Sequence, residues 1–121
     1  MDIVLDEKIS IIANEIYKEL GSGHRECVYH RAFEIELRNR WIQYECEVVI
    51  PISYKGQFIS HMRLDLVIAK NIIIELKSVK NIKDDDVQQI TRYLKATGMK
   101  SGFLINFGNE NVDVRKIEIQ S

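Results

Sequence analysis

The segment 72–77, with the sequence IIIELK, constrains the fold more than any other part of the chain. It is short, almost entirely apolar and rich in isoleucine, which is the composition of a central strand covered on both faces. Such a strand needs elements packed against both sides of its sheet. The segment therefore predicts a sheet flanked by helices, and its two charged residues, Glu75 and Lys77, need a separate explanation.

Helices are predicted where apolar side chains recur at intervals of three and four residues. One stripe predicts a helix over about 6–20 with Asp6 as its N-cap, and a second predicts a helix over about 24–40. A third helix is expected over 84–97, with Gly98 as its stop. The side chains expected to face the core are Ile9, Ile12, Ala13, Ile16, Tyr17 and Leu20 in the first helix and Val28, Tyr29, Ala32, Phe33, Ile35 and Leu37 in the second, with Trp41 and Ile42 closing the core.

Strands are predicted where β-branched residues alternate with other residues. They are expected from residue 44 to the Lys55-Gly56 turn, and over 58–68, 72–77, 102–107 and 112–119. The resulting order, ααβββαββ, is a meander followed by a crossover helix. It predicts an α/β (α+β) fold with one central mixed sheet flanked by helices, and residues 1–121 are expected to form a single domain.

Composition excludes several classes of protein. With 45% hydrophobic and 29% charged residues, the chain can build a core, which argues against disorder. The two cysteines form no CxxC pair and complete no zinc-type spacing with the three histidines, so structural zinc and a disulfide scaffold are not expected. The residues concerned are Cys27, Cys46, His24, His30 and His61, and the histidines are expected at the surface or at helix ends rather than as catalytic bases. No apolar run reaches the ~18 residues of a membrane span and no signal-peptide pattern is found, so we expect a cytoplasmic protein without a membrane partner.

Charge is distributed unevenly although the net charge is only −1. Residues 1–50 carry six basic and ten acidic groups, whereas residues 51–121 carry eleven and eight. An anionic partner should therefore meet the second half of the chain. Differences of this size also arise by chance, in which case the charges only solvate the surface.

Two carboxylates are predicted to meet across a hairpin. A three-residue loop over 69–71 places Ile68 opposite Ile72, and the same antiparallel register places Asp65 opposite Glu75. Such loops usually end on a residue in the left-handed region, which Asn71 would tolerate. Opposed side chains lie close enough for both carboxylates to bind one Mg²⁺.

Lys77 shares its face of the strand with Glu75, because side chains alternate with a period of two. The trio of Asp65, Glu75 and Lys77 can therefore be a metal site with an adjacent cation. A surface ion-pair cluster is the alternative, since a Glu-x-Lys pattern is short and ion pairs are common. A two-residue loop would place Asp65 on the opposite face and remove the site.

The order of four motifs resembles the PD-(D/E)XK nuclease superfamily. Asp65 followed by Glu75-Leu76-Lys77 resembles its signature, and 23–29, GHRECVY, matches the G-x-x-E-x-x-Y pattern of its GxxExxY family. The segment 89–93, QITRY, is similar to the Q-x-x-x-Y element of exonuclease-like members, and 104–107, LINF, looks like the fourth core strand. The resemblance spans about residues 9–119 and implies a restriction-endonuclease-like core.

The resemblance also implies catalytic roles. Asp65, Glu75 and the Leu76 backbone carbonyl look like the ligands of Mg²⁺ or Mn²⁺, and Lys77 would hold the attacking water and stabilise the developing negative charge. Glu26 resembles the helical acid that reaches toward the metal, although a first-turn carboxylate is also favoured by the helix dipole alone. Such an ion activates water and neutralises phosphate oxygens without a catalytic serine or histidine.

Residues of the third helix are expected to contact the substrate. Gln89 and Tyr93 lie four residues apart on one face, so Gln89 could orient a phosphate or a metal-bound water while Tyr93 supports it. The alternative places Tyr93 in the core and Gln89 in solvent. Four basic residues that could follow a phosphate backbone, or be merely solvated, are Lys80, Lys83, Arg92 and Lys95.

The resemblance, together with the placement of Asp65, Glu75 and Lys77, implies a metal-dependent nuclease that hydrolyses phosphodiester bonds in nucleic acid, with DNA as the expected substrate. The alternative is a non-catalytic module that binds nucleic acid or protein and retains a nuclease-like fold. A near-neutral chain of 121 residues lacks the large basic surface of a stable duplex binder. A homodimer, a larger nucleoprotein partner, or binding restricted to ends and junctions would compensate for this lack.

Overall fold

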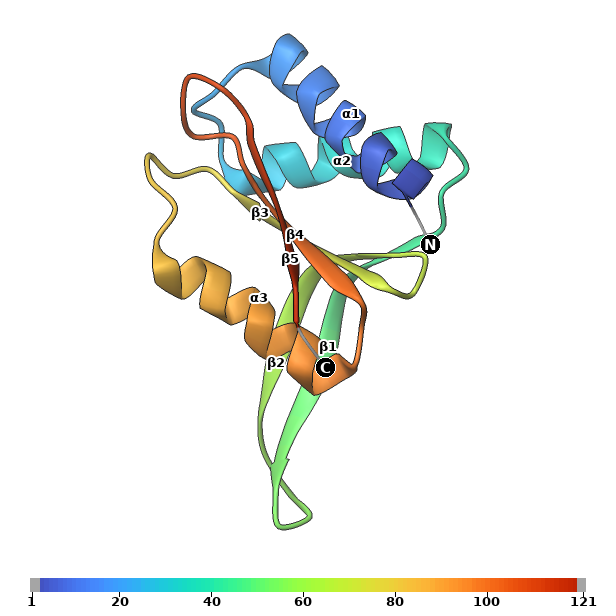
Figure 1. Ribbon diagram of the computed structural model, residues 1–121, viewed down its shortest axis with the longest axis vertical. Coiled ribbons are helices and arrows are strands. Elements are labelled where there is room, and N and C mark those ends of the chain that lie inside the picture. The colour runs from blue at the N-terminus through green and yellow to red at the C-terminus, as the bar shows by residue number, and fades with distance from the viewer. Residues whose placement is uncertain (1–2, 120–121) are drawn as a thin grey trace.

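The computed structural model describes residues 3–119 and has the element order predicted from the sequence (Figure 1). Within those residues no helix is both long and apolar enough to cross a membrane. The elements are α1 (Ile3–Leu20), α2 (Glu26–Asn39), β1 (Tyr44–Tyr54), β2 (Gln57–Ile68), β3 (Ile72–Lys77), α3 (Asp84–Thr97), β4 (Ser101–Asn106) and β5 (Asp113–Glu118).

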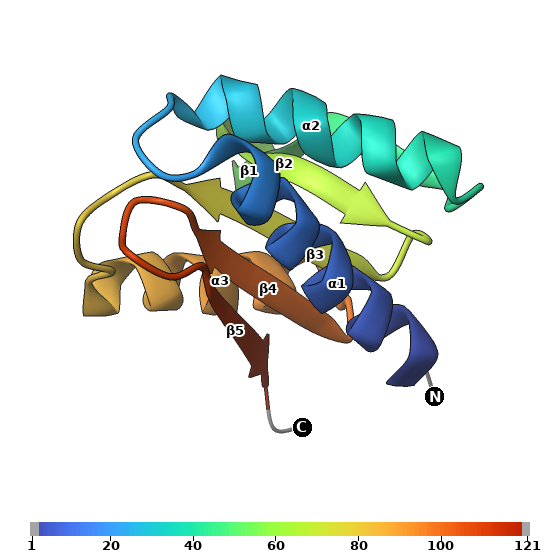
Figure 2. The same cartoon turned by 90° about the horizontal axis from the view of Figure 1, so that it is seen from above.

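The strands form one mixed sheet in the order β1-β2-β3-β4-β5. Neighbours are antiparallel except β3 and β4, which are parallel and joined through α3. Figure 2 shows α1 and α2 on one face of the sheet and α3 on the other. The predicted α+β class, with a central mixed sheet flanked by helices, is therefore confirmed.

β3 is buried on both faces, as its composition predicts. Ile72, Ile74 and Leu76 pack into the cluster beneath α1 and α2. Ile73 packs into the second cluster, beneath α3. The predicted apolar stripe of α1 lies wholly in the first cluster or against it. The alternation of β3 thus gives Glu75 and Lys77 the direction of Ile73, toward α3.

The helix starts differ from those predicted. Asp6 is not an N-cap, because α1 is already helical at Ile3, and its carboxylate instead pairs with the Lys116 ammonium at 2.7 Å. α2 begins at Glu26 rather than near residue 24. Its apolar face is also narrower than expected, since Val28 and Ile35 are exposed.

Trp41 does not close the core, contrary to the prediction, and is 94% exposed. It follows the last turn of α2 with a φ of 58°, in the left-handed region. The N–H of Trp41 donates to the Arg38 carbonyl and that of Ile42 to the Leu37 carbonyl, which is a Schellman termination. This geometry turns the chain back toward the sheet and directs the Trp41 side chain into solvent, while Ile42 packs against the core.

The β2–β3 loop keeps the predicted register but not the predicted backbone conformation. Ile68 lies opposite Ile72, as a three-residue loop requires. The left-handed residues are Ala69 and Lys70, with φ of 52° and 59°, and not Asn71. Asn71 instead donates its N–H to the Ile68 carbonyl, and its side chain accepts a hydrogen bond from the Lys100 N–H.

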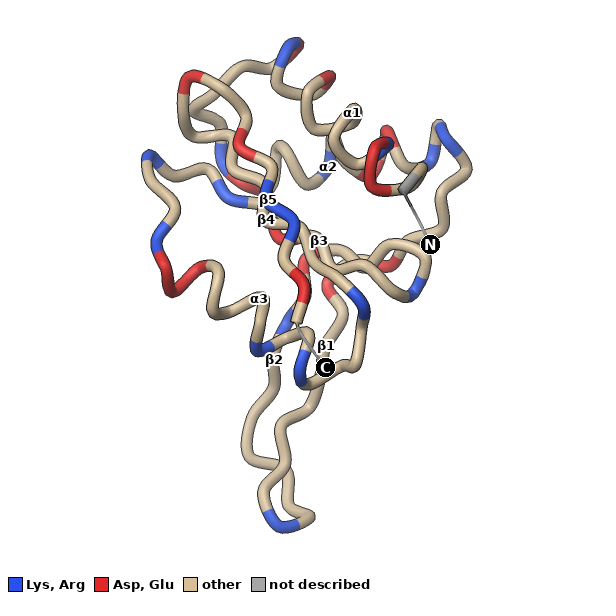
Figure 3. The backbone as a smooth tube through the Cα atoms, viewed as in Figure 1, with Lys and Arg blue, Asp and Glu red and all other residues tan. Residues whose placement is uncertain are grey.

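The β1–β2 hairpin extends well beyond the helices (Figure 1). Its turn is Lys55-Gly56, as predicted, and both residues have positive φ. Figure 3 shows little charge along its outer half apart from Lys55 at the tip. Large apolar side chains are exposed along it at Val49, Tyr54, Phe58 and Ile59.

The left-handed backbone of Trp41 makes a stability prediction. Trp41→Gly should raise the free energy of unfolding by about 0.5 to 1 kcal/mol, because glycine adopts this conformation without steric cost and the exposed side chain contributes little packing. Trp41→Ala keeps the unfavourable conformation and serves as the control. Both variants lack the single tryptophan of the chain and therefore its fluorescence. Their free energies of unfolding are measured by urea unfolding followed by circular dichroism. Equal stability of the two variants would contradict the assignment.

Candidate active site

β2 and β3 part where their carboxylates meet. Their backbone pairing runs from Ile68 and Ile72 to Leu66 and Ile74, and the next step of this register places Asp65 opposite Glu75. At that step the Asp65 carboxylate accepts a hydrogen bond from the Leu76 N–H at 3.1 Å. The Asp65 side chain thus accepts a hydrogen bond from a backbone N–H of β3, in place of a backbone carbonyl of β2. The structure brings Asp65 and Glu75 together, as the register predicts.

Glu75 is a largely buried carboxylate with an unfilled acceptor. Among residues 3–119, its Oε1 is the buried side-chain polar atom that has no hydrogen-bond partner. Burial, then the charge of Asp65, raises the pKa of Glu75 from its ordinary 4.5 to about 8, despite the opposing effect of Lys77. Burial also raises the pKa of Asp65, against the Leu76 hydrogen bond and the charges of His30 and Lys77. Two carboxylates in this position favour a shared proton or a cation.

Lys77 is held beside the carboxylates by α3. Its ammonium lies 3.4 Å from the Asp86 carboxylate, which also accepts the Lys83 N–H at 2.9 Å. Burial lowers the pKa of Lys77, but the charges of Asp86, Glu26 and Glu75 outweigh burial and leave it raised. Lys77 is therefore a cation at neutral pH. The role of Asp86 as the partner of Lys77 was not predicted from the sequence. The pattern that could have indicated it is the acidic first turn of α3.

The Leu76 carbonyl faces the same side as Asp65. Within a strand, the N–H and C=O of one residue point in one lateral direction, and those of the next residue point in the other. The Leu76 N–H reaches Asp65, whereas the Lys77 carbonyl accepts the Phe107 N–H next to β4 at 2.9 Å. The predicted backbone oxygen is thus directed toward β2, the side from which the Asp65 carboxylate approaches.

The tyrosine of the G-x-x-E-x-x-Y segment, Tyr29, anchors this segment to the core. The Tyr29 ring stacks on Phe107 with centroids 4.2 Å apart. Its hydroxyl donates to the Gly21 carbonyl at 2.6 Å and accepts the His24 N–H at 3.2 Å. Tyr29 thereby fixes the loop that precedes α2, in which Gly23 has a φ of 95° that favours glycine. Tyr29 is thus a core residue that positions the first turn of α2.

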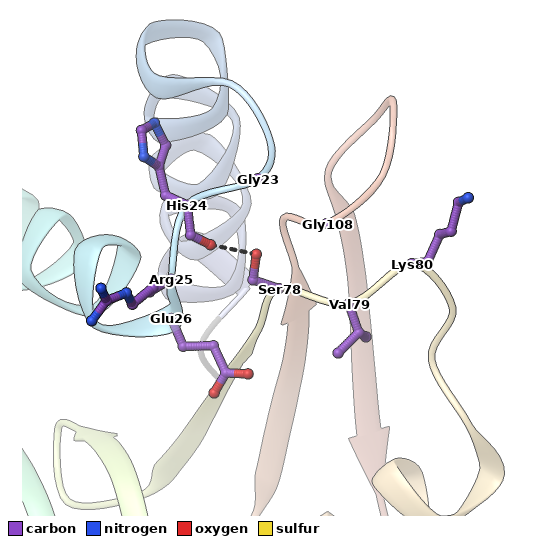
Figure 4. Close-up of a pocket in the computed structure, with 8 residues that line it drawn as sticks. All are labelled: Gly23, His24, Arg25, Glu26, Ser78, Val79, Lys80 and Gly108. Atoms are coloured by element: carbon purple, nitrogen blue, oxygen red, sulfur yellow. Dashed lines mark hydrogen bonds between the residues drawn. The ribbon is translucent and has the colours of Figure 1, made fainter.

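Glu26 stands in that first turn and is exposed. In Figure 4 its side chain extends from the start of α2 toward the sheet. Its charge is a minor cause of the raised pKa values of Glu75 and Lys77. Among the described residues, Glu26, Asp65 and Glu75 do not bring one ligand atom each within 4.8 Å of one another, so Glu26 reaches the carboxylate pair only by rotation of its exposed side chain.

A pocket of about 440 Å³ adjoins Glu26. Val79 lines this pocket, and its backbone is held by the buried side chain of Asn106. Asn106 accepts a hydrogen bond from the Val79 N–H at 2.9 Å and donates one to the Val79 carbonyl at 2.8 Å. The Ser78 hydroxyl joins this side of the pocket to the opposite wall by donating to the His24 carbonyl at 2.6 Å. Asn106 was not anticipated as a positioning residue. The lining residues are Gly23, His24, Arg25, Glu26, Ser78, Val79, Lys80 and Gly108 (Figure 4).

The sequence left open whether Gln89 and Tyr93 form a substrate-facing pair or whether Tyr93 is a core residue and Gln89 is solvated. The structure shows a core tyrosine that is nevertheless paired with Gln89. Tyr93 is buried in the cluster beneath α3, and Gln89 is half-buried and donates to its hydroxyl. Burial raises the pKa of Tyr93, the hydrogen bond with Gln89 lowers it, and the charges of Glu75 and Asp65 raise it further. Arg92 and Lys95 are exposed on α3, where Arg92 lies 3.6 Å from Asp85.

A family model described as the PD-(D/E)XK nuclease superfamily matches residues 4–117. The chain belongs to this superfamily. Divalent metal ions are the usual cofactors of PD-(D/E)XK nucleases, and the donor set of Asp65, Glu75 and Leu76 suits such an ion. No curated protein sequence matches the chain at a significant level.

Two solved structures share the fold of this PD-(D/E)XK chain. The crystal structure of SSO0001 aligns with a TM-score of 0.60 at 22% identity, over 78% of this chain and 50% of that chain. An alkaline exonuclease (LHK-Exo) from Laribacter hongkongensis aligns with a TM-score of 0.55 at 10% identity, over 96% of this chain and 69% of that chain. The chain thus spans half the length of SSO0001. The predicted restriction-endonuclease-like core is confirmed.

The raised pKa of Glu75 makes a pH prediction for the metal-free protein in EDTA. The folded state binds a proton that the unfolded state has already released between pH 4.5 and about 8, so stability should fall as the pH rises through that window. We expect a loss on the order of 2 to 4 kcal/mol in urea unfolding. Glu75→Gln should flatten the profile. The exposed Glu19→Gln is the control and should not, and a wild-type profile that is already flat would contradict the prediction.

Proposed function

We propose that the chain is a divalent-metal-dependent nuclease of the GxxExxY type, in which Asp65, Glu75, the Leu76 carbonyl and Glu26 hold Mg²⁺ or Mn²⁺. The observation that carries this proposal is the buried Glu75 Oε1 without a partner. A buried carboxylate oxygen without a donor costs free energy unless a cation or proton meets it. Asp65 and the Leu76 carbonyl beside it offer further oxygen ligands, which Mg²⁺ prefers.

A bound divalent ion would lower the pKa of a coordinated water and neutralise phosphate oxygens. The residues of the chain supply the remaining chemistry. Lys77 carries its charge beside the carboxylates and can hold the attacking water and stabilise negative charge on the phosphate. Asp86 keeps the Lys77 ammonium in place at 3.4 Å. Gln89, supported by Tyr93, can orient a phosphate oxygen.

The substrate we propose is nucleic acid, and we propose DNA in preference to RNA. The likeness to an alkaline exonuclease supports phosphodiester hydrolysis. Lys80 lines the pocket beside Glu26, while Arg92 and Lys95 lie exposed on α3, so these residues can contact phosphates beyond the scissile one. With a net charge of −1, we expect a second copy or a nucleoprotein partner to contribute to substrate binding, in the cytoplasm.

Substitution of Lys77 tests the reaction. Lys77→Ala should abolish Mg²⁺- or Mn²⁺-dependent cleavage, because it removes the charge beside the reacting phosphate, while circular dichroism stays unchanged. Labelled single- and double-stranded DNA and RNA are incubated with each ion and with EDTA. Lys8→Ala, on α1 across the sheet from α3, is the matched control and should cleave normally. Cleavage by Lys77→Ala at the wild-type rate, or none by the wild type on any substrate, would favour the non-catalytic module.

Thermal unfolding tests the metal site without relying on activity. At ten times the dissociation constant, an ion bound only by the folded state contributes about 1.4 kcal/mol, which raises the Tm by roughly 4 to 6 °C for a domain of this size. Wild type should show this shift with millimolar Mg²⁺ or Mn²⁺. Asp65→Asn should lose most of it, because one of the anionic ligands is gone. Equal shifts for the two proteins would place the ion elsewhere.

A further inference from the structure

A second group of metal-binding side chains lies between α2 and β1. His30 and Glu34 are one turn apart on α2, and Cys46 faces them from β1. One ligand atom of each lies within 4.8 Å of the others, and His30 Nε2 is 3.3 Å from Glu34 Oε2. None of the three is a member of the oxygen-lined site at the end of β3.

The group opens onto solvent through a pocket of about 260 Å³. Cys46 is exposed, while the side chains of His30 and Glu34 retain 18% and 20% exposure, so an ion can enter without opening the fold. The pocket is also lined by Cys27, Arg31 and Glu47.

Glu34 is oriented by partners of its own. The Tyr44 hydroxyl donates to Glu34 Oε1 at 3.0 Å, and Arg38 donates to the same hydroxyl at 2.7 Å. Arg38 also lies 3.7 Å from Glu34 Oε1. These contacts hold one carboxylate oxygen and leave Oε2 directed at His30. Partners of this kind orient the ligands of established metal sites.

The donor atoms select a class of ion. An imidazole nitrogen and a thiolate sulfur favour zinc-like transition metals over Mg²⁺, which prefers oxygen alone. Tetrahedral ligands around Zn²⁺ lie roughly 3.3 to 3.8 Å apart, so the present spacing requires only small side-chain rotations. Three protein ligands leave a fourth position for water, the arrangement of open zinc sites.

We propose that His30, Glu34 and Cys46 form a binding site for a zinc-class transition-metal ion, separate from the Asp65 and Glu75 site. Sequence spacing does not indicate this site, because Cys46 lies in the strand that follows the helical pair and the zinc-type spacings are absent. Packing of β1 against the N-terminal helices brings the third ligand to the pair.

Cobalt(II) is the probe for this site, because a thiolate bound to Co²⁺ gives a charge-transfer absorption that oxygen ligands do not. The reduced wild-type protein titrated with Co²⁺ should show this band at one equivalent, and Zn²⁺ should remove it by displacement. Cys46→Ser should lose the band. Cys27→Ser is the matched control, since Cys27 is the other exposed cysteine and lines the same pocket, and it should retain the band.

Further variants test the remaining ligands and the independence of the two sites. His30→Gln and Glu34→Gln should each weaken Co²⁺ binding at least tenfold, with circular dichroism confirming the fold. Asp65→Asn should keep the band even though it loses the response to Mg²⁺, so failure of either proposal is recognised separately. Absence of the band in wild type, its persistence in Cys46→Ser, its loss in Cys27→Ser, or its removal by millimolar Mg²⁺ would overturn the proposal.

Discussion

The hydrogen bond from the Leu76 N–H to the Asp65 carboxylate is the contact on which the site depends. It occurs where backbone pairing between β2 and β3 ends, so the two strands separate at the place where their acidic side chains meet. Separation turns the Leu76 carbonyl toward a space between the strands instead of toward a paired backbone. The same contact holds Asp65 in position while leaving its second oxygen free for a cation. One side-chain bond thus connects the architecture of the sheet with its chemistry.

Burial of β3 on both faces determines the electrostatics of that space. A carboxylate at the end of such a strand loses water, and burial is the largest cause of the raised pKa of Glu75. α3 provides the compensating charge indirectly, because Asp86 in its first turn retains the Lys77 ammonium beside the acids. Asn106 and Tyr29 fix the neighbouring segments through their hydrogen bonds to backbone groups. Asp65 and Lys77 are thus each positioned by a partner outside the trio of charged residues, the Leu76 N–H and the Asp86 carboxylate.

The sequence predicted what periodicity and register determine. The element order, the opposition of Asp65 and Glu75, and the direction of Lys77 all follow from alternation and loop length. It failed where backbone geometry or packing between elements decides the outcome. Trp41 has the large apolar side chain of a core residue, but the left-handed backbone at the end of α2 directs it into solvent. The partnership of Lys77 with Asp86 and the convergence of Cys46 on His30 each join two consecutive elements. Periodicity within one helix or strand does not determine how that element packs against the next.

The projecting β1–β2 hairpin combines exposed apolar side chains with an open sheet edge, since β1 is the first strand of the order. An edge of this kind is a template for adding strands from other chains. Pro51, the single proline, stands in the middle of β1 and has no N–H to offer such a strand. A proline is tolerated in a strand where its nitrogen faces away from the ladder. Pro51 therefore interrupts the outer edge of the hairpin and protects the protein against aggregation through intermolecular β-pairing.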